Sequence, residues 1–239
     1  MLRVSSLLVP PRYDQPELLD MGAGTPQDVK ASLSDLWRIN RYLGGIPAIT
    51  RHLFPRLMAQ TGTVTLADIG TGSAEIPAYI ARWAHSKNLS LRMMPLDLAS
   101  RNLAIARDNT NSLPNVHLVQ ADARHLPFAH NSVDYVMSSV FLHHFPPEQV
   151  IDLLRQAFAI ARRGIVMSDG VRGWLPLIAF KIGQPIFARS YITRFDGAAS
   201  IRRAYTPSEM RQFAAEAGLT NARVYRHPLW RMTLVADKP

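Results

Sequence analysis

The sequence predicts an α/β fold built on a doubly wound, mostly parallel sheet. An apolar run ends at Asp68 and leads directly into a glycine-rich turn, and the order of apolar run, acid and helix-like stretch then recurs at Asp97 and at Asp122. Neighbouring acids are separated by about 30 residues, the length of one strand–helix–strand unit. Because the carboxyl ends of parallel strands meet at one edge of a sheet, we expect the three carboxylates to be neighbours.

The N-terminal part, residues 1–60, is expected to form a helical cap segment outside the sheet. Thr25 is a predicted N-cap with Pro26 in the first helical position, and a pair of glycines at 44–45 ends that helix. A second short helix is expected over 47–60, before the first strand.

The glycine-rich turn favours a cationic ligand. Gly70 and Gly72 can take positive φ and let a ligand approach the backbone closely. Asp68, at the last turn of the strand, repels phosphate and suits a cation, and Glu75 occupies the third glycine position of a dinucleotide-binding frame. A nicotinamide-cofactor loop is therefore not expected.

The next two acids suit a nucleoside. After a helix over 76–87, a strand over 91–96 ends in Asp97, whose carboxylate can accept both ribose hydroxyls. A strand over 116–120 then leads to Asp122, whose carboxylate can accept an exocyclic amine. Any one of these acids suits a turn or a helix cap equally well, so the prediction rests on their recurrence in one frame.

The remaining chain continues the alternation and then departs from a minimal fold. We expect a strand ending near Ser139, a helix over 147–162, a strand over 165–168, a helix beginning at a Thr206 capping box, and strands over 222–225 and 232–236. The connection over about 171–200 is much longer than usual in α/β proteins and is rich in apolar residues. It is predicted to form one or two lid helices over the site.

At this point the chain resembles the class I S-adenosylmethionine-dependent methyltransferases. It is most similar to their bacterial small-molecule branch, which includes the ubiquinone and menaquinone biosynthesis methylases. The resemblance rests on LADIGTGSAEIP at 66–77, LDLAS at 96–100, QADARHLPF at 120–128 and NSVDYVMSSVFLHHF at 131–145. It implies a Rossmann-like, seven-stranded sheet with the last strand antiparallel, and a cofactor-binding methyltransferase domain over 61–239.

The resemblance also implies a set of site residues. The cofactor would be S-adenosylmethionine, and its contacts would be Asp68, Gly70, Thr71, Gly72, Ser73, Asp97, Leu98, Asp122, Ala123 and Ser139. Ala74 stands where the glycine pattern often has its third Gly, which puts only close helix packing in question. The N-terminal helix would either pack or contact cofactor and substrate through Trp37, Arg38, Asn40, Arg41 and Tyr42.

His143 and His144 are the candidate catalytic residues. They follow the fourth strand, where the methyl group should emerge, and a neutral imidazole can take a phenolic proton at neutral pH. Such a pair can also be structural. On an extended segment adjacent side chains point to opposite sides, so we expect only one to act, with His143 preferred. No metal site is expected, because two adjacent histidines lack a further ligand at a suitable spacing.

The predicted function is methyl transfer to a hydrophobic small molecule, aromatic or polyketide- or quinol-like, with O-methylation ahead of C-methylation. An RNA or protein methyltransferase is the alternative that the formal charge of +9 suggests, but the basic residues are scattered, so nucleic acid is not the expected partner. A non-catalytic cofactor-binding protein stays open, as does the oligomeric state. Docking of the lid on a membrane surface is a minor alternative, because residues 171–200 show no clean amphipathic period.

Composition adds little to this. Apolar residues make up 47% and cysteine is absent, so disulfides and thiolate metal sites are excluded. The N-terminal apolar run is broken by Pro10 and Pro11 and does not fit a signal peptide, and no run reaches the roughly 18 apolar residues that a membrane span needs. We expect a cytoplasmic protein.

Overall fold

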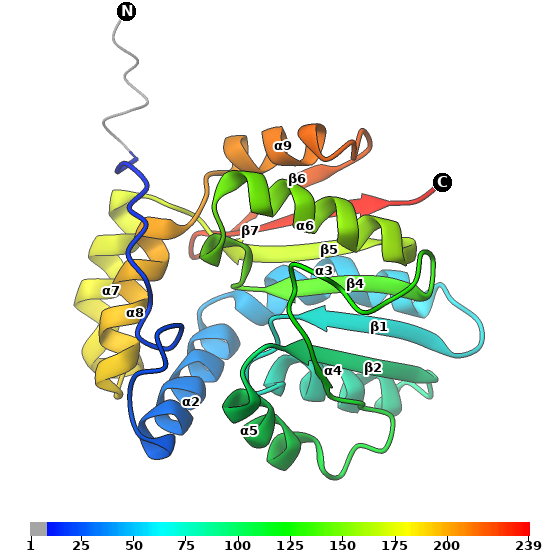
Figure 1. Ribbon diagram of the computed structural model, residues 1–239, viewed down its shortest axis with the longest axis horizontal. Coiled ribbons are helices and arrows are strands. Elements are labelled where there is room, and N and C mark those ends of the chain that lie inside the picture. Colours follow the sequence, from blue (N-terminus) through cyan, green and yellow to red (C-terminus); the bar gives the residue numbers. More distant parts are fainter. Residues whose placement is uncertain (1–8) are drawn as a thin grey trace, which may run out of the picture.

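A computed structural model describes residues 9–239 (Figure 1). Residues 1–8, which hold most of the N-terminal apolar run, lie outside the described residues. The strands are β1 (Val64–Ile69), β2 (Leu91–Asp97), β3 (Val119–Gln120), β4 (Val133–Ser139), β5 (Ala161–Gly170), β6 (Arg223–His227) and β7 (Arg231–Asp237). They form one sheet in the order β3-β2-β1-β4-β5-β7-β6. Only β7 runs against its neighbours, so the predicted fold class, including the antiparallel last strand, is confirmed.

Helices cover both faces of the sheet. One core packs α6 (Pro147–Ile160) and α9 (Pro207–Glu216) against one face, and a second packs α3 (Gly45–Met58) and α4 (Glu75–Ser86) against the other. The residues of β1 alternate between these cores, with Leu66 in one and Ala67 in the other. Such alternation is what a strand buried on both faces requires. α5 (Ser100–Thr110) connects β2 to β3.

Two strands begin three or more residues away from their predicted starts. β3 has only two residues, and Val116, its predicted start, makes a single isolated bridge to Met93 at the edge of the sheet. β5 is longer than predicted and takes in Arg162, the expected last residue of the preceding helix, together with Arg163. Both arginines lie within ion-pair distance of Asp134 on β4, at 3.6 and 3.3 Å, which favours their extended pairing beside that strand.

The remaining helices gather at one end of the sheet. α2 (Pro26–Tyr42), α7 (Trp174–Phe187) and α8 (Tyr191–Arg203) lie together there, and residues 9–24, the blue trace in Figure 1, run along α8 before turning into α2. Capping boxes at Thr25 with Asp28 and at Thr206 with Glu209 begin α2 and α9. Among the described residues, none of the helices combines the length and apolar character needed to cross a membrane.

Candidate functional site

A cavity of about 1020 Å³ lies at the carboxyl ends of the central strands. The strand order reverses between β1 and β4, which is where ligands bind in open α/β sheets. One wall is the glycine-rich turn with the ends of β2 and β4, and the other is formed by α2, α7 and α8. The volume is at the upper end of the range for single ligand pockets, so it accommodates a cofactor and a second molecule.

The glycine-rich turn is shaped by left-handed backbone. Gly70 and Gly72 have φ of +72° and +57°, and a Cβ added to Gly70 would overlap the ring of Phe141. Ala74, which caps α4, is also left-handed at φ 55° and is fully buried. The expectation that alanine affects only helix packing here is therefore wrong, because a residue with a Cβ costs roughly 1–2 kcal/mol in this conformation.

Asp97 fixes the turn from the neighbouring strand. Its Oδ2 accepts the backbone N–H of Gly72 at 2.8 Å, and its Oδ1 accepts those of Ala99 at 2.9 Å and of the Asn102 amide at 3.2 Å. Burial raises the pKa of Asp97, and the backbone donors partly offset that rise. The carboxylate lines the cavity and keeps lone pairs for a ribose hydroxyl.

Asp68 lies behind the turn, whereas Glu75 reaches the cavity wall. Asp68 is 2% exposed, and burial raises its pKa to about 7. Glu75 lines the cavity, accepts the Ser73 hydroxyl at 2.8 Å, and has a pKa raised by burial to about 7. Sequence reasoning treated Glu75 only as a missing glycine, so the structure adds a second acid near a cationic ligand.

The other predicted cofactor residues line the same cavity. They are Gly70, Thr71, Gly72, Ser73, Leu98, Asp122, Ala123 and Ser139. Asp122 already accepts Nη2 of Arg124 at 2.6 Å, and this hydrogen bond holds the pKa of the Asp122 carboxyl below its usual range. Ser139 Oγ is buried at the end of β4 and has no hydrogen-bond partner among the described residues. A ligand at this end of the cavity would satisfy it, which fits S-adenosylmethionine.

His143 and His144 do not lie on an extended segment. They form a 3₁₀ turn, η1 (Leu142–His144), and their rings lie side by side with centroids 4.4 Å apart. The expectation that the two rings point to opposite sides is therefore wrong. In this turn both rings meet carboxylates of other segments, His143 those of Asp169 and Glu17 and His144 that of Asp20.

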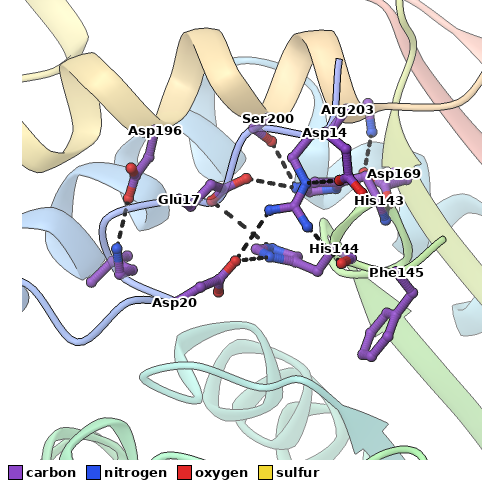
Figure 2. A network of polar contacts seen from close by, with 12 residues as sticks. Asp14, Glu17, Asp20, His143, His144, Phe145, Asp169, Asp196, Ser200 and Arg203 are labelled. Atoms are coloured by element: carbon purple, nitrogen blue, oxygen red, sulfur yellow. Dashed lines mark hydrogen bonds and ion pairs between the residues drawn. The ribbon is translucent and has the colours of Figure 1, made fainter. Parts of the chain in front are cut away.

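His143 is held by three side chains (Figure 2). Its Nδ1 lies 2.8 Å from Asp169, and its Nε2 lies 3.3 Å from Glu17 and 2.8 Å from Ser200. Burial alone lowers the pKa of His143, but the charges and hydrogen bonds of Asp169 and Glu17 outweigh it and raise the pKa to about 10. At neutral pH His143 is an imidazolium and cannot accept a proton from a substrate.

His144 is the more available of the pair. Its Nδ1 lies 2.8 Å from Asp20, its side chain is 20% exposed, and it lines the cavity. Its Nε2 lies 4.0 Å from Glu17 Oε2, beyond hydrogen-bond distance. The geometry thus favours His144 over His143 as a proton acceptor.

The N-terminal segment that contains Glu17 and Asp20 is held in place by contacts with η1 and with α8. Arg12 donates to the carbonyl oxygens of His143 and Phe145, each at 3.1 Å. Arg203 of α8 pairs with Asp14 and Asp20 at 3.2 Å each (Figure 2). Asp196 of α8 accepts the backbone N–H groups of residues 18 and 19 at 2.7 and 3.2 Å.

Glu17, His143 and His144 lie close enough together to be considered as metal ligands, with ligand-capable atoms within 4.8 Å of one another. The reason given for expecting no metal site was the lack of a third ligand, and the fold supplies one. A metal needs a neutral imidazole, however, and Nε2 of His143 is already engaged by Glu17 and Ser200. We therefore interpret the cluster as an ion-pair network.

Four residues of this network were missed from the sequence: Glu17, Asp20, Asp169 and Ser200. Asp169 follows the apolar run of β5 in SDG, as Asp68 follows that of β1 in ADIG, so the same frame could have found it. The other three have no local signal. Of the predicted contacts on α2, Trp37 and Asn40 line the cavity, while Arg38 pairs with Asp35.

The sequence and the fold are similar to those of known proteins. Residues 66–164 match the model of the methyltransferase domain family. The chain carries a class I S-adenosylmethionine-dependent methyltransferase domain. Its cofactor is S-adenosylmethionine.

Curated relatives agree with this. A demethylmenaquinone methyltransferase of Staphylococcus epidermidis is 28% identical over 149 residues, and that of Staphylococcus aureus is 27% identical over 141. Each alignment covers between 54% and 59% of this chain, and the chain spans 59% and 58% of those two relatives. The methyltransferase domain is thus related to the menaquinone methylases over about three fifths of their length.

Solved structures share the fold over nearly the whole chain. A S-adenosylmethionine-dependent methyltransferase from Aquifex aeolicus has a TM-score of 0.60 at 15% identity, covering 90% of this chain and 99% of its own. Magnesium protoporphyrin IX methyltransferase from Synechocystis, solved with bound S-adenosylhomocysteine, has a TM-score of 0.58 at 13% identity, covering 94% and 89%. These solved structures therefore share the fold over at least nine tenths of the chain.

Proposed function

We propose that this protein methylates an oxygen of a hydrophobic small molecule, of aromatic, polyketide or quinol type, using S-adenosylmethionine. The observation that carries the proposal is the single cavity that joins the glycine-rich turn to α7 and α8. One end offers carboxylates and backbone turns to a nucleoside, and the other offers mostly apolar side chains. A bound acceptor would meet the cofactor between these two ends.

Within this proposal Asp97, Glu75 and Ser139 bind the cofactor in the part of the cavity next to the glycine-rich turn. S-adenosylmethionine, when bound, supplies an electrophilic methyl group. The protein's task is then to position the acceptor and exclude water, which contributes much of the rate in such displacements. The apolar residues of α7 and α8 that line the cavity, among them Phe180, Phe187 and Ile201, serve both needs.

His144 is the general base in this proposal. Its Nε2 would take the proton of a phenol or enol hydroxyl, and Asp20 on Nδ1 would stabilise the resulting imidazolium. His143, with Asp169, is a positioning residue that fixes η1 and the N-terminal segment. The preference from sequence for His143 is thus replaced by His144.

The experiment is an acceptor screen with deuterium-labelled methyl cofactor. Purified protein is incubated with phenols, quinols and hydroxylated polyketides, and in parallel with total RNA and with a protein extract. We expect label in a small apolar product, with the methyl group on oxygen by NMR. Asp97→Ala is the matched control, because it should lose cofactor affinity and hence labelling of every acceptor.

Other outcomes would replace the proposal. Labelling of RNA or protein alone would move the activity to a macromolecular acceptor, and a methyl group on carbon would correct the acceptor atom. Tight cofactor binding without any product would indicate a binding protein.

A further inference from the structure

The outer surface of α7 is apolar and exposed. Five large side chains, between 45% and 75% exposed, lie on one face of the helix, because Leu175 and the three isoleucines follow one another at spacings of three or four residues and Trp174 adjoins Leu175: Trp174, Leu175, Ile178, Ile182 and Ile186. We call these five residues the outer ridge. Single exposed apolar residues are common on proteins, but a row of five along one helix is not.

The opposite face of the same helix lines the cavity. Pro176, Ala179, Phe180, Gly183 and Phe187 all contribute to its wall. Apart from Gln184, which also lines the cavity, α7 is therefore apolar on both sides, and this is why the sequence shows no amphipathic period there. A helix that is apolar all round is normally buried, yet in Figure 1 α7 lies at the outside of the molecule, beyond α8.

The exposed charges of residues 171–200, the segment that carries the outer ridge, all have one sign. Lys181, Arg189 and Arg194 are exposed, whereas the only acid between residues 171 and 200 is Asp196, which is buried against the N-terminal segment. A segment whose exposed charges are all cationic, beside a row of exposed apolar side chains, complements an anionic lipid headgroup layer. It opposes pairing with a second copy of the chain, because that would bring like charges together.

The same segment carries two exposed aromatic rings with a polar atom. Trp174 begins α7 and Tyr191 begins α8, and they are 45% and 53% exposed. Tryptophan and tyrosine favour the boundary between headgroups and acyl chains, where the ring is in apolar surroundings and the polar atom meets water.

We propose that the outer ridge docks this protein on the surface of an anionic lipid bilayer. The ridge residues insert among the headgroups, and the basic residues pair with lipid phosphates. Docking would place the cavity-lining face of α7 next to the membrane boundary, so that an apolar acceptor could pass from lipid into the site. This route for the acceptor rests on the proposed function, whereas docking itself does not.

The test is co-sedimentation with vesicles. The full chain is mixed with vesicles of phosphatidylcholine alone, or of phosphatidylcholine and phosphatidylglycerol in equal parts, at low and at high salt. Two variants carry the test: Leu175→Gln with Ile182→Gln and Ile186→Gln, and Lys181→Gln with Arg189→Gln. Met58→Gln, a change at a 60% exposed residue of α3 remote from α7, is the matched control.

We expect the wild type and Met58→Gln to bind the anionic vesicles. The triple variant should bind at least about tenfold more weakly at both salt concentrations, and the double variant should be weaker mainly at low salt. Equal binding by wild type and triple variant, or no binding by the wild type, would overturn the proposal. So would lipid-free self-association of the wild type that the triple variant abolishes, because a second copy would then cover the ridge.

Calorimetric titration with S-adenosylhomocysteine separates this proposal from the proposed function. None of the substituted residues lines the cavity, so every variant should bind this ligand as the wild type does. A wild type that binds the ligand but not the vesicles refutes docking alone. A wild type that binds vesicles but not the ligand refutes the proposed function alone.

Discussion

The carboxylate of Asp169 lies 2.8 Å from Nδ1 of His143, and both side chains are buried. The other oxygen of Asp169 accepts the backbone N–H of His143 at 3.2 Å. These two contacts join the end of β5 to the turn that follows β4. Because the pair is charged and shielded from water, its protonation affects the stability of the fold.

Stability should fall as pH rises above neutral. The folded-state pKa of His143 is about 10 against an ordinary value of 6.5, so its contribution is complete below about pH 6.5 and is lost as pH rises through 10. The free energy of unfolding should decline by up to about 1.4 kcal/mol per pH unit in that window. Urea denaturation at several pH values measures the slope, and His143→Gln should remove it.

The same urea denaturation series, extended to acidic pH, also tests the partner of His143. The pKa of Asp169 is lowered mainly by the charge and hydrogen bond of His143, which outweigh the effect of burial. Its contribution is therefore present above the ordinary value of 3.8 and is lost as pH falls through the folded-state value. If His143→Gln kept the wild-type slope above neutral pH, the pair would not be ionised as described.

Removal of the His144 imidazole should affect turnover and leave cofactor binding unchanged. His144→Ala is expected to lower kcat by about 10²- to 10⁴-fold if it removes the general base, and Asp20→Asn should lower it less. Calorimetry with S-adenosylhomocysteine checks that affinity is preserved. His130→Ala, at an exposed histidine, is the control. Full activity of His144→Ala at every pH would assign the proton transfer to another group.

Gly70→Ala should impair both stability and cofactor binding. The residue has φ +72°, and an added Cβ would overlap the ring of Phe141, whereas Gly62, at φ +80°, has nothing within 4 Å of an added Cβ. Gly62→Ala should therefore cost only the backbone strain of roughly 1–2 kcal/mol, and Gly70→Ala should cost more. Thermal denaturation compares the two, and equal losses would show that the Phe141 ring moves aside freely.

Affinity for S-adenosylmethionine should increase between pH 6 and pH 8. Burial raises the pKa values of Glu75 and Asp68 to about 7, and a cationic ligand favours their ionised forms. The gain should reach at most about tenfold per pH unit for each group that ionises on binding. S-adenosylhomocysteine, whose sulfur is uncharged, should respond less. Glu75→Gln should flatten the profile, and a profile unchanged by this substitution would place the charge elsewhere.

Much of the cofactor half could be predicted because its signals are local. A strand that ends in an acid is recognised from a few consecutive residues, and this pattern predicted Asp97, which lines the cavity. Ser139, which also lines it, was implied by the family resemblance. The sequence pattern did not show how deeply each acidic side chain is buried. Asp68 and Glu75 are both near the turn, but only the structure shows that Glu75 is the one at the wall.

The part of the cavity proposed for the acceptor is built by contacts between residues that are distant in sequence. Glu17 meets His143 across 126 positions of sequence, and Asp196 meets Leu18 across 178. No periodic pattern in the sequence predicts contacts between residues so far apart. The local error at η1 has the same origin, since the turn of His143 and His144 is favoured by carboxylates from β5 and the N-terminal segment.

The N-terminal segment also lies outside the part of the chain that defines the family. Residues 66–164 hold the cofactor wall and both histidines, while Glu17, Asp20 and Ser200 come from either side of them. On the proposed function, the acceptor would therefore meet side chains that the family match does not cover. A match over 66–164 alone carries no information about which molecule is accepted, so a comparison of acceptors has to start from the residues on either side of it.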